Sequence, residues 1–278
     1  MLDGAMIVWF ALAIPSIAFV IWDSFANGVT SWVQRIAWIL VTVYTGPIGL
    51  FLYLMACRRP FPGGHDAFTK PTWKQAVNSE MHCLAGDATG IAVAASIVPL
   101  FGLANGWDAT IEYLAGFLMG LFVFQALMMR AMYDGDYWRA VRKTFFAETV
   151  SMNMVMAGMI PFMLILADYW QGSENPLNPA FWFRMGLATI VGGVIAYPMN
   201  FWLVSNHLKH GCMTLPGADG PAPHLGLRSP EAKAGGGGKM EMGKLPTGQA
   251  VIWIAITFAI LLGALWITNA IGPIRFAG

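Results

Sequence analysis

Seven long apolar runs constrain the fold of this chain more than any other feature. An α-helix needs about 20 mostly apolar residues to cross the hydrocarbon core of a membrane. In the whole chain 57% of the residues are hydrophobic and 11% are charged, whereas soluble domains carry about 25% charged residues. The sequence therefore predicts an all-α protein in a lipid bilayer, a polytopic transmembrane bundle of about seven spans. The predicted spans are Met6–Ile21, Ile36–Cys57, His82–Leu103, Ile111–Met129, Ala147–Ala167, Phe181–Val204 and Ala250–Ile271.

The basic residues predict how the bundle is oriented. Thirteen of the sixteen Lys and Arg residues fall in the connections after the second, fourth and sixth spans, which alternate along the chain and so share one side. Cytoplasmic connections are enriched in Lys and Arg. We therefore expect these connections in the cytoplasm, the N-terminus inside and the C-terminus outside. The three remaining basic residues, Arg35, Arg184 and Arg275, are expected on the other side.

The same pattern divides the chain into four parts. Residues 1–79 hold two N-terminal spans and a cytoplasmic connection, and residues 80–217 hold a core of four spans. Residues 218–248 are dominated by Pro, Gly and Ala, which is typical of a flexible linker. Residues 249–278 hold the C-terminal span. The first run lacks a basic segment before it, so we interpret it as a retained helix, with a signal peptide cleaved near Ala26 as the alternative.

Polar and sulfur-bearing side chains gather at one level of the predicted bundle. His82, Cys83 and Asp87 begin the third span and so lie in its cytoplasmic third. The cytoplasmic ends of the neighbouring spans bring further such groups to this level, and an ionisable residue inside a span is costly unless it is paired or faces a cavity. The candidate metal ligands are His82, Cys83, Asp87, His207, His210 and Cys212, with Glu148, Met152, Met156 and Asn200 as further candidates.

Two patterns in this set have both a functional and a structural interpretation. His207 and His210 are spaced i, i+3, which lets two imidazoles on one helix face the same ion. Imidazoles near the C-terminus of a helix are also favourable in their own right, because they meet its negative pole. The methionines between Met152 and Met163 share one helical face, which suits a path for Cu(I) or a flexible packing surface. We favour packing for the methionines.

Asp87 and Glu148 are the two clear ionisable residues within the predicted spans. One interpretation is a cytoplasmic-facing site for a cation or a polar ligand. The other is that both carboxylates reach the membrane surface or pair with Arg130 and Arg142. The neighbouring imidazole and thiol favour the first interpretation for Asp87, and the two interpretations are balanced for Glu148.

Several classes of function are disfavoured. The net charge of +1 gives no basic field for nucleic acid. The chain has no phosphate-binding loop, dinucleotide fingerprint, nucleophile elbow or Cys-x-x-Cys-His motif, so it gives no support for an enzyme of those classes. Its three cysteines, Cys57, Cys83 and Cys212, do not make a disulfide framework and are expected as free thiols.

Two segments carry a resemblance to a known family. Residues 81–90 read Met-His-Cys-Leu-Ala-Gly-Asp-Ala-Thr-Gly, and residues 207–211 read His-Leu-Lys-His-Gly after the Tyr-Pro-Met-Asn of 197–200. These segments resemble the domain of unknown function DUF4396, a bacterial and archaeal membrane domain, from about Glu80 to Gly217. The resemblance implies a four-span unit in the inner (cytoplasmic) membrane and marks His82, Cys83, Lys209 and His210 as matching positions. The family pattern often has a cysteine where this chain has Asp87.

Three hypotheses for the function follow. The first, which we favour, is the binding or transport of a transition-metal cation such as copper, or zinc, at the cytoplasmic-facing His, Cys and Asp residues. The second is a non-catalytic subunit of a larger respiratory or photosynthetic membrane complex, with other subunits as partners. The third is a membrane redox protein that holds one haem between His82 and His207.

Overall fold

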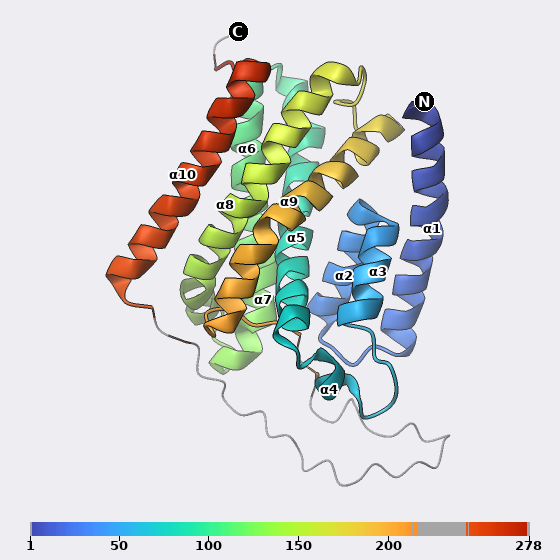
Figure 1. Ribbon diagram of the computed structural model, residues 1–278, viewed down its shortest axis with the longest axis vertical. Helices are drawn as coiled ribbons and strands as arrows, with labels where there is room; N and C mark the ends of the chain where they lie inside the picture. Colours follow the sequence, from blue (N-terminus) through green and yellow to red (C-terminus); the bar gives the residue numbers. More distant parts are fainter. Residues whose placement is uncertain (1, 213, 216–242, 244, 277–278) are drawn as a thin grey trace.

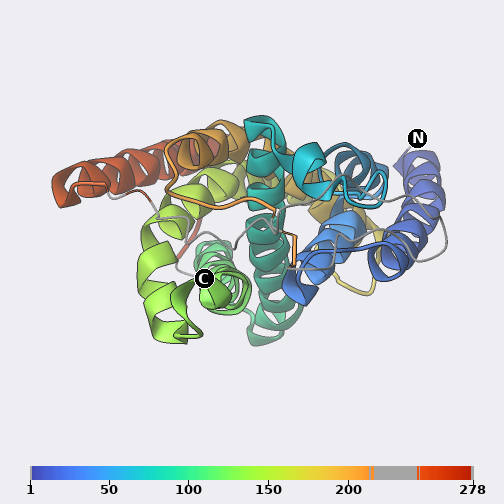
Figure 2. The ribbon, with the colours of Figure 1, turned by 90° about the horizontal axis from the view of Figure 1, so that it is seen from below.

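The protein is a bundle of long helices. A computed structural model describes residues 2–212, 214–215, 243 and 245–276. These residues form no strand, only an isolated bridge between Thr30 and Thr214. The long helices run side by side (Figure 1), and the view from below places α5 centrally, with α1 and α10 at opposite ends of an elongated cross-section (Figure 2). The elements are α1 (Leu2–Ala26), α2 (Trp32–Thr45), α3 (Pro47–Ala56), α4 (His65–Thr69), α5 (Thr72–Ile97), η1 (Val98–Phe101), α6 (Asn105–Leu118), η2 (Met119–Gln125), α7 (Ala126–Met129), η3 (Arg130–Tyr133), α8 (Tyr137–Tyr169), α9 (Pro179–Ser205) and α10 (Thr247–Ile271).

The prediction of an all-α, multi-pass membrane protein is confirmed, with six spans in the described residues. Six helical stretches there are long and apolar enough to cross a membrane. They are Asp3–Ala26, Thr72–Phe101, Asn105–Met129, Tyr137–Ala167, Pro179–Ser205 and Thr247–Ile271. The predicted linker, residues 218–248, falls largely outside the described residues.

The predicted second span is a hairpin of two short helices. Gly46 ends α2 with a backbone φ of 55° and ψ of −127°, which suits a residue without a Cβ, and Pro47 starts α3. The ring of Trp38 in α2 packs against that of Tyr53 in α3. The hydroxyl of Tyr53 donates to Asp23 near the end of α1, at 2.8 Å. Both ends of the hairpin therefore lie at the same end of the bundle, where a kinked continuous span was expected.

The hairpin changes the topology. Because α2 and α3 do not cross, the first turn of α1 lies at the same end of the bundle as the last turn of α10 (Figure 1). We call the opposite end, which carries α4, the basic end. Arg35 belongs there, since its guanidinium donates to the carbonyl oxygens of Gly28 and Thr30 and Thr30 bridges to Thr214. The predictions that the termini lie on opposite sides and that Arg35 lies away from the other basic residues are therefore wrong.

Helix α5 is the central element, and small residues let its neighbours approach closely. A Cβ at Gly86 would lie 2.7 Å from the Cα of Gly120 in η2, and one at Gly90 would lie 2.7 Å from the Cα of Gly116 in α6. Larger residues at these positions would separate the helices. This close approach brings the polar side chains of α5 against the helices that follow it.

Candidate functional site

Helix α5 carries a group of buried polar side chains at mid-helix. The side chains of Glu80, His82, Cys83 and Asp87 are all almost fully buried. They are enclosed because α5 packs against α2, α6, η2, α8 and α9. Burying several ionisable groups in one membrane-spanning helix is costly, so their surroundings decide what they can do.

The first neighbour is a π-helical segment, η2, which lies between α6 and α7 within the apolar span Asn105–Met129. Turns of this kind are rare and are often found at functional sites. Gly120 in η2 leaves the space that two carboxylates occupy, since a Cβ there would collide with Asp87 of α5 and Glu148 of α8. The oxygens Asp87 Oδ1 and Glu148 Oε1 thus converge on one point beside Gly120.

The thiol of Cys83 joins these carboxylates. Its sulfur lies 3.0 Å from Glu148 Oε2 and donates a hydrogen bond to it. The same sulfur lies 3.7 Å from Nδ1 of His82 and 3.9 Å from Oε1 of Gln125 in η2. One thiol, one imidazole and two carboxyl groups therefore lie close together inside the bundle.

Lys209 supplies the positive charge of the cluster. Helix α9 ends at Ser205, and the chain turns back at His207, whose φ is 57°. The buried Lys209 Nζ donates to Asn200 Oδ1 at 2.6 Å and to Ser151 Oγ at 3.1 Å. Burial alone would lower the pKa of Lys209, but the Cys83 thiol and the Glu148 carboxylate outweigh burial and raise it. Lys209 therefore stays an ammonium ion.

The charges of the cluster do not balance around this single lysine. Three buried carboxyl groups, those of Glu80, Asp87 and Glu148, face one buried ammonium group. Within the described residues, Glu80 Oε1, both oxygens of Asp87 and Glu148 Oε1 accept no hydrogen bond. Unpaired buried carboxylates are costly, so they require protons or a bound cation. We call the group of Glu80, His82, Cys83, Asp87, Glu148, Asn200 and Lys209 the polar cluster.

The structure brings together most of the residues that the sequence singled out. His82, Cys83, Asp87, Glu148 and Asn200 all belong to the polar cluster. His210 lies close to it, because its backbone is within reach of the ring of His82. The sequence did not predict the roles of Lys209, Gln125 and Ser151, and their positions depend on a chain reversal and a π-turn that leave no periodic signal. Glu80 was detectable, since it precedes Asp87 by seven residues and so shares its helical face.

Two predicted ligands lie elsewhere. The prediction that His207 and His210 share a helical face is wrong, because α9 ends before both of them and His207 is exposed. The sulfur of Cys212 lies 3.7 Å from that of Cys57, and not beside Cys83. A chain reversal after α9 thus separates residues that a continued helix would have kept together.

The methionines of α8 pack in the core. Met152, Met156 and Met159 are fully buried. The terminal methyl groups of Met152 and Met156 face the space above Gly116 of α6. This position agrees with the packing interpretation of the stripe.

Comparison with known proteins gives one match. Residues 72–209 match the model of a family described as a domain of unknown function, DUF4396. The matched segment begins with α5 and ends at Lys209, so it contains the whole polar cluster. No curated protein and no solved structure matches the sequence.

Proposed function

Since residues 72–209 make this chain a member of the DUF4396 family, whose description assigns no activity, we propose its function from the polar cluster. The protein binds a transition-metal cation, copper or zinc, in this cluster and carries it across the membrane. One observation carries the proposal: the carboxyl groups of Asp87 and Glu148 converge at Gly120, beside the Cys83 thiol. Both oxygens of Asp87 and Oε1 of Glu148 have no hydrogen-bond partner among the described residues.

The donor atoms support a transition metal over a hard cation. A thiolate and an imidazole favour copper and zinc, whereas carboxylates alone would favour magnesium or calcium. Cys83 supplies sulfur, and Asp87 and Glu148 supply oxygen. His82 supplies Nε2, which has no hydrogen-bond partner in the described part of the chain. When no metal is bound, the ammonium group of Lys209 is the positive charge that faces the carboxyl groups. When a metal cation binds, it supplies further positive charge to the same carboxyl groups.

Polar groups on the far side of the cluster support transport. At the end of the bundle opposite the basic end, a pocket is lined by Asp108, Glu112, Glu174 and Arg184, among others. Between this pocket and the cluster, the hydroxyl of Tyr113 donates to Asn153 Oδ1 at 2.8 Å. Ionisable residues inside a membrane domain commonly mark an ion pathway.

The same proposal includes an orientation. The connections at the basic end carry most of the basic residues, and Lys and Arg are enriched on the cytoplasmic side. We therefore place the basic end in the cytoplasm and both ends of the described chain on the opposite side. His82 is buried in the polar cluster and His207 is exposed, so we prefer the metal cation to a haem held between these two residues.

The test is the metal content of the detergent-purified protein after loading with zinc, or with Cu(I) under reducing conditions. The double variant Asp87→Asn/Glu148→Gln keeps the shape of both side chains and removes their charge. It should bind about one equivalent of metal less than the unchanged protein. The control is Asp134→Asn, at an exposed carboxylate near the basic end, which should bind as much metal as the unchanged protein. Equal binding by the double variant would refute the proposal.

A further inference from the structure

A second group of potential ligands lies at the basic end, outside the segment that matches the family. It consists of Cys57 after α3, His65 at the start of α4 and Cys212 after α9. Their ligand atoms all lie within 4.8 Å of one another. The two sulfurs are 3.7 Å apart, and Nε2 of His65 lies 3.8 Å from the sulfur of Cys212. All three side chains are buried.

Backbone contacts hold these distant segments together. Thr30 forms its bridge with Thr214, and the amide of Leu215 donates to the carbonyl oxygen of Val29 at 2.8 Å. The segment after α9 is thus fixed to the connection between α1 and α2. The three ligands therefore converge through the fold of the chain itself, before any metal is considered.

Both ring nitrogens of His65 have oxygen partners, and Nε2 lies 3.0 Å from the carbonyl oxygen of Cys57. The hydroxyl of Thr214 donates to the Asp66 carboxylate, so its oxygen is free to accept from Nδ1 of His65, 2.6 Å away. Nε2 also faces the sulfur of Cys212, and a metal bound at Nε2 would replace its contact with the carbonyl oxygen of Cys57. A carboxylate that orients a histidine in this way is common behind metal ligands.

The chemistry of the two thiols is also suited to a metal. Burial raises the pKa of Cys57, but hydrogen bonds with Cys212 and His65 outweigh burial and lower it to about 6. The pKa of Cys212 is raised, first by its hydrogen bond with Cys57 and then by burial. Cysteine binds a metal as the thiolate, so the protons of the two thiols would be released when the metal binds.

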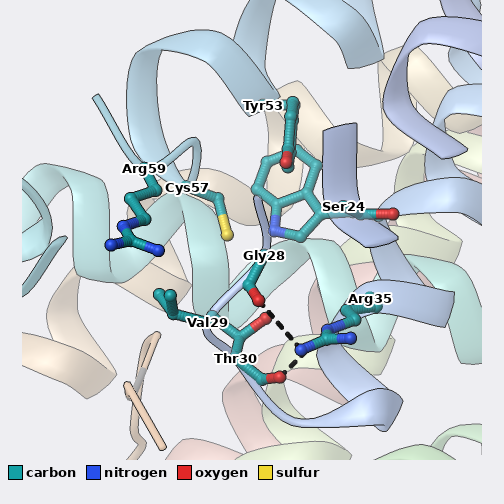
Figure 3. Close-up of a pocket in the computed structure, with 9 residues that line it drawn as sticks. Ser24, Gly28, Val29, Thr30, Arg35, Tyr53, Cys57 and Arg59 are labelled. Atoms are coloured by element: carbon teal, nitrogen blue, oxygen red, sulfur yellow. Dashed lines mark hydrogen bonds between the residues drawn. The ribbon is translucent and has the colours of Figure 1, made fainter. Parts of the chain in front are cut away.

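One of the three residues, Cys57, also belongs to a pocket at the basic end. The pocket is lined by Ser24, Gly28, Val29, Thr30, Arg35, Trp38, Tyr53, Cys57 and Arg59. Figure 3 shows the sulfur of Cys57 on the wall of this pocket. Arg35 lies across from it and is held by Gly28 and Thr30. Cys57 thus connects the pocket to the buried pair of His65 and Cys212.

We propose that Cys57, His65 and Cys212 form a metal site for a borderline or soft cation, Zn²⁺ or Cu⁺. Two thiolates and one imidazole suit both ions. Three protein ligands leave a fourth position of tetrahedral zinc open for water or an exchanging ligand. The proposal does not depend on metal binding in the polar cluster, because the two groups share no ligand.

The test uses Cys83→Ser as the starting protein, so that Cys57 and Cys212 are the only cysteines left. Co²⁺ is the spectroscopic probe, since bonds from cobalt to thiolate give intense near-ultraviolet absorption. We expect this absorption with about one equivalent of Co²⁺, and its displacement by Zn²⁺. Adding Thr214→Val, which removes the partner of His65 Nδ1, should weaken zinc binding roughly 10–100-fold. Adding Thr110→Val instead, at the other end of the bundle, should leave zinc binding unchanged.

A second measurement needs no variant. In the unchanged protein, Zn²⁺ should slow the alkylation of Cys57 and Cys212, measured by mass spectrometry of their peptides. Equal alkylation with and without Zn²⁺, or the absence of a thiolate band with Co²⁺ in the folded Cys83→Ser protein, would overturn the metal site. So would a disulfide between Cys57 and Cys212 in protein whose thiols were blocked at cell lysis. Each of these results leaves the metal content of the polar cluster as a separate question.

Discussion

At the scale of single residues, Gly120 has the most specific role. Its missing side chain makes the space in which the Asp87 and Glu148 carboxyl groups meet. We predict that Gly120→Ala displaces both groups and lowers metal binding to the polar cluster by at least about tenfold, as misplaced supporting groups do at other metal sites. The matched control is Gly263→Ala in α10, where a Cβ meets nothing within 4 Å. The Gly263→Ala variant should leave metal binding unchanged and stabilise the helix by up to about 1 kcal/mol.

Titration with zinc tests both variants. Unchanged zinc binding by Gly120→Ala would contradict the geometry of the cluster.

Lys209 is predicted to hold the cluster together when no metal is present. Lys209→Met removes the ammonium group and leaves the carboxyl groups without their counter-charge. Buried charges left without compensation cost about 3–5 kcal/mol, and thermal unfolding in detergent should show a loss of this order. Because the pKa of Lys209 is raised above 10.5, this contribution is present at neutral pH and is lost only as the pH rises through that elevated value. Lys143→Met, at an exposed position, should change the stability by less than about 0.5 kcal/mol. Equal stability of Lys209→Met and Lys143→Met would show that the charge of Lys209 does not stabilise the cluster.

The residues of the cluster were partly predictable. Polar side chains are rare in apolar spans, so His82, Cys83, Asp87 and Glu148 were visible in the sequence, and the order of the spans placed them at one level. The sequence did not predict a role in the site for Lys209, and it placed Cys212 in the wrong group of ligands. Both follow from the reversal of the chain at His207, after α9. A reversal of this kind depends on tertiary contacts and has no periodic pattern.

At the scale of elements, the α2–α3 hairpin decides the topology. The run from Ile36 to Cys57 is long enough for one span, and hydropathy alone does not distinguish a kink from a reversal. The distinction lies in Gly46, whose φ of 55° turns the chain before Pro47 starts the next helix. Apolar helices of 10 to 14 residues are typical of segments that enter a membrane without crossing it, and α2 and α3 have 14 and 10 residues.

The hairpin makes a direct prediction about the two ends of the chain. An epitope tag before α1 and one after α10 should be on the same side of the membrane. Antibody access to each tag in sealed membrane vesicles of known orientation measures this. If one tag is accessible in the sealed vesicles and the other becomes accessible only after the vesicles are opened, α2 and α3 cross the membrane as one span.

Gly46 itself should be sensitive to substitution. Gly46→Ala places a Cβ in a strained backbone conformation, and that Cβ would lie 3.2 Å from the Cβ of Ala13. We expect a loss of about 1–3 kcal/mol in the free energy of unfolding. Gly248→Ala, where a Cβ meets nothing within 4 Å, is the control, and equal stability of the two variants would contradict the assigned turn.

At the scale of the whole molecule, two groups of ligands lie at different depths. Cys57, His65 and Cys212 lie at the basic end, and the polar cluster lies between the helices of the family domain. The segment from Lys209 to Cys212 connects the two groups. Lys209 belongs to the polar cluster, and Cys212 is one of the proposed ligands at the basic end. This connection suits a cation that is first bound at the basic end and then passed into the cluster.

The most direct test of the account is metal flux through the reconstituted protein. Proteoliposomes with a fluorescent metal indicator inside would be exposed to zinc, or to Cu(I) under reducing conditions. The unchanged protein and Asp134→Asn should raise the indicator signal above that of protein-free vesicles, and Asp87→Asn/Glu148→Gln should not. Flux through the double variant equal to that of the unchanged protein, or no flux through any of the folded proteins, would contradict transport through the polar cluster.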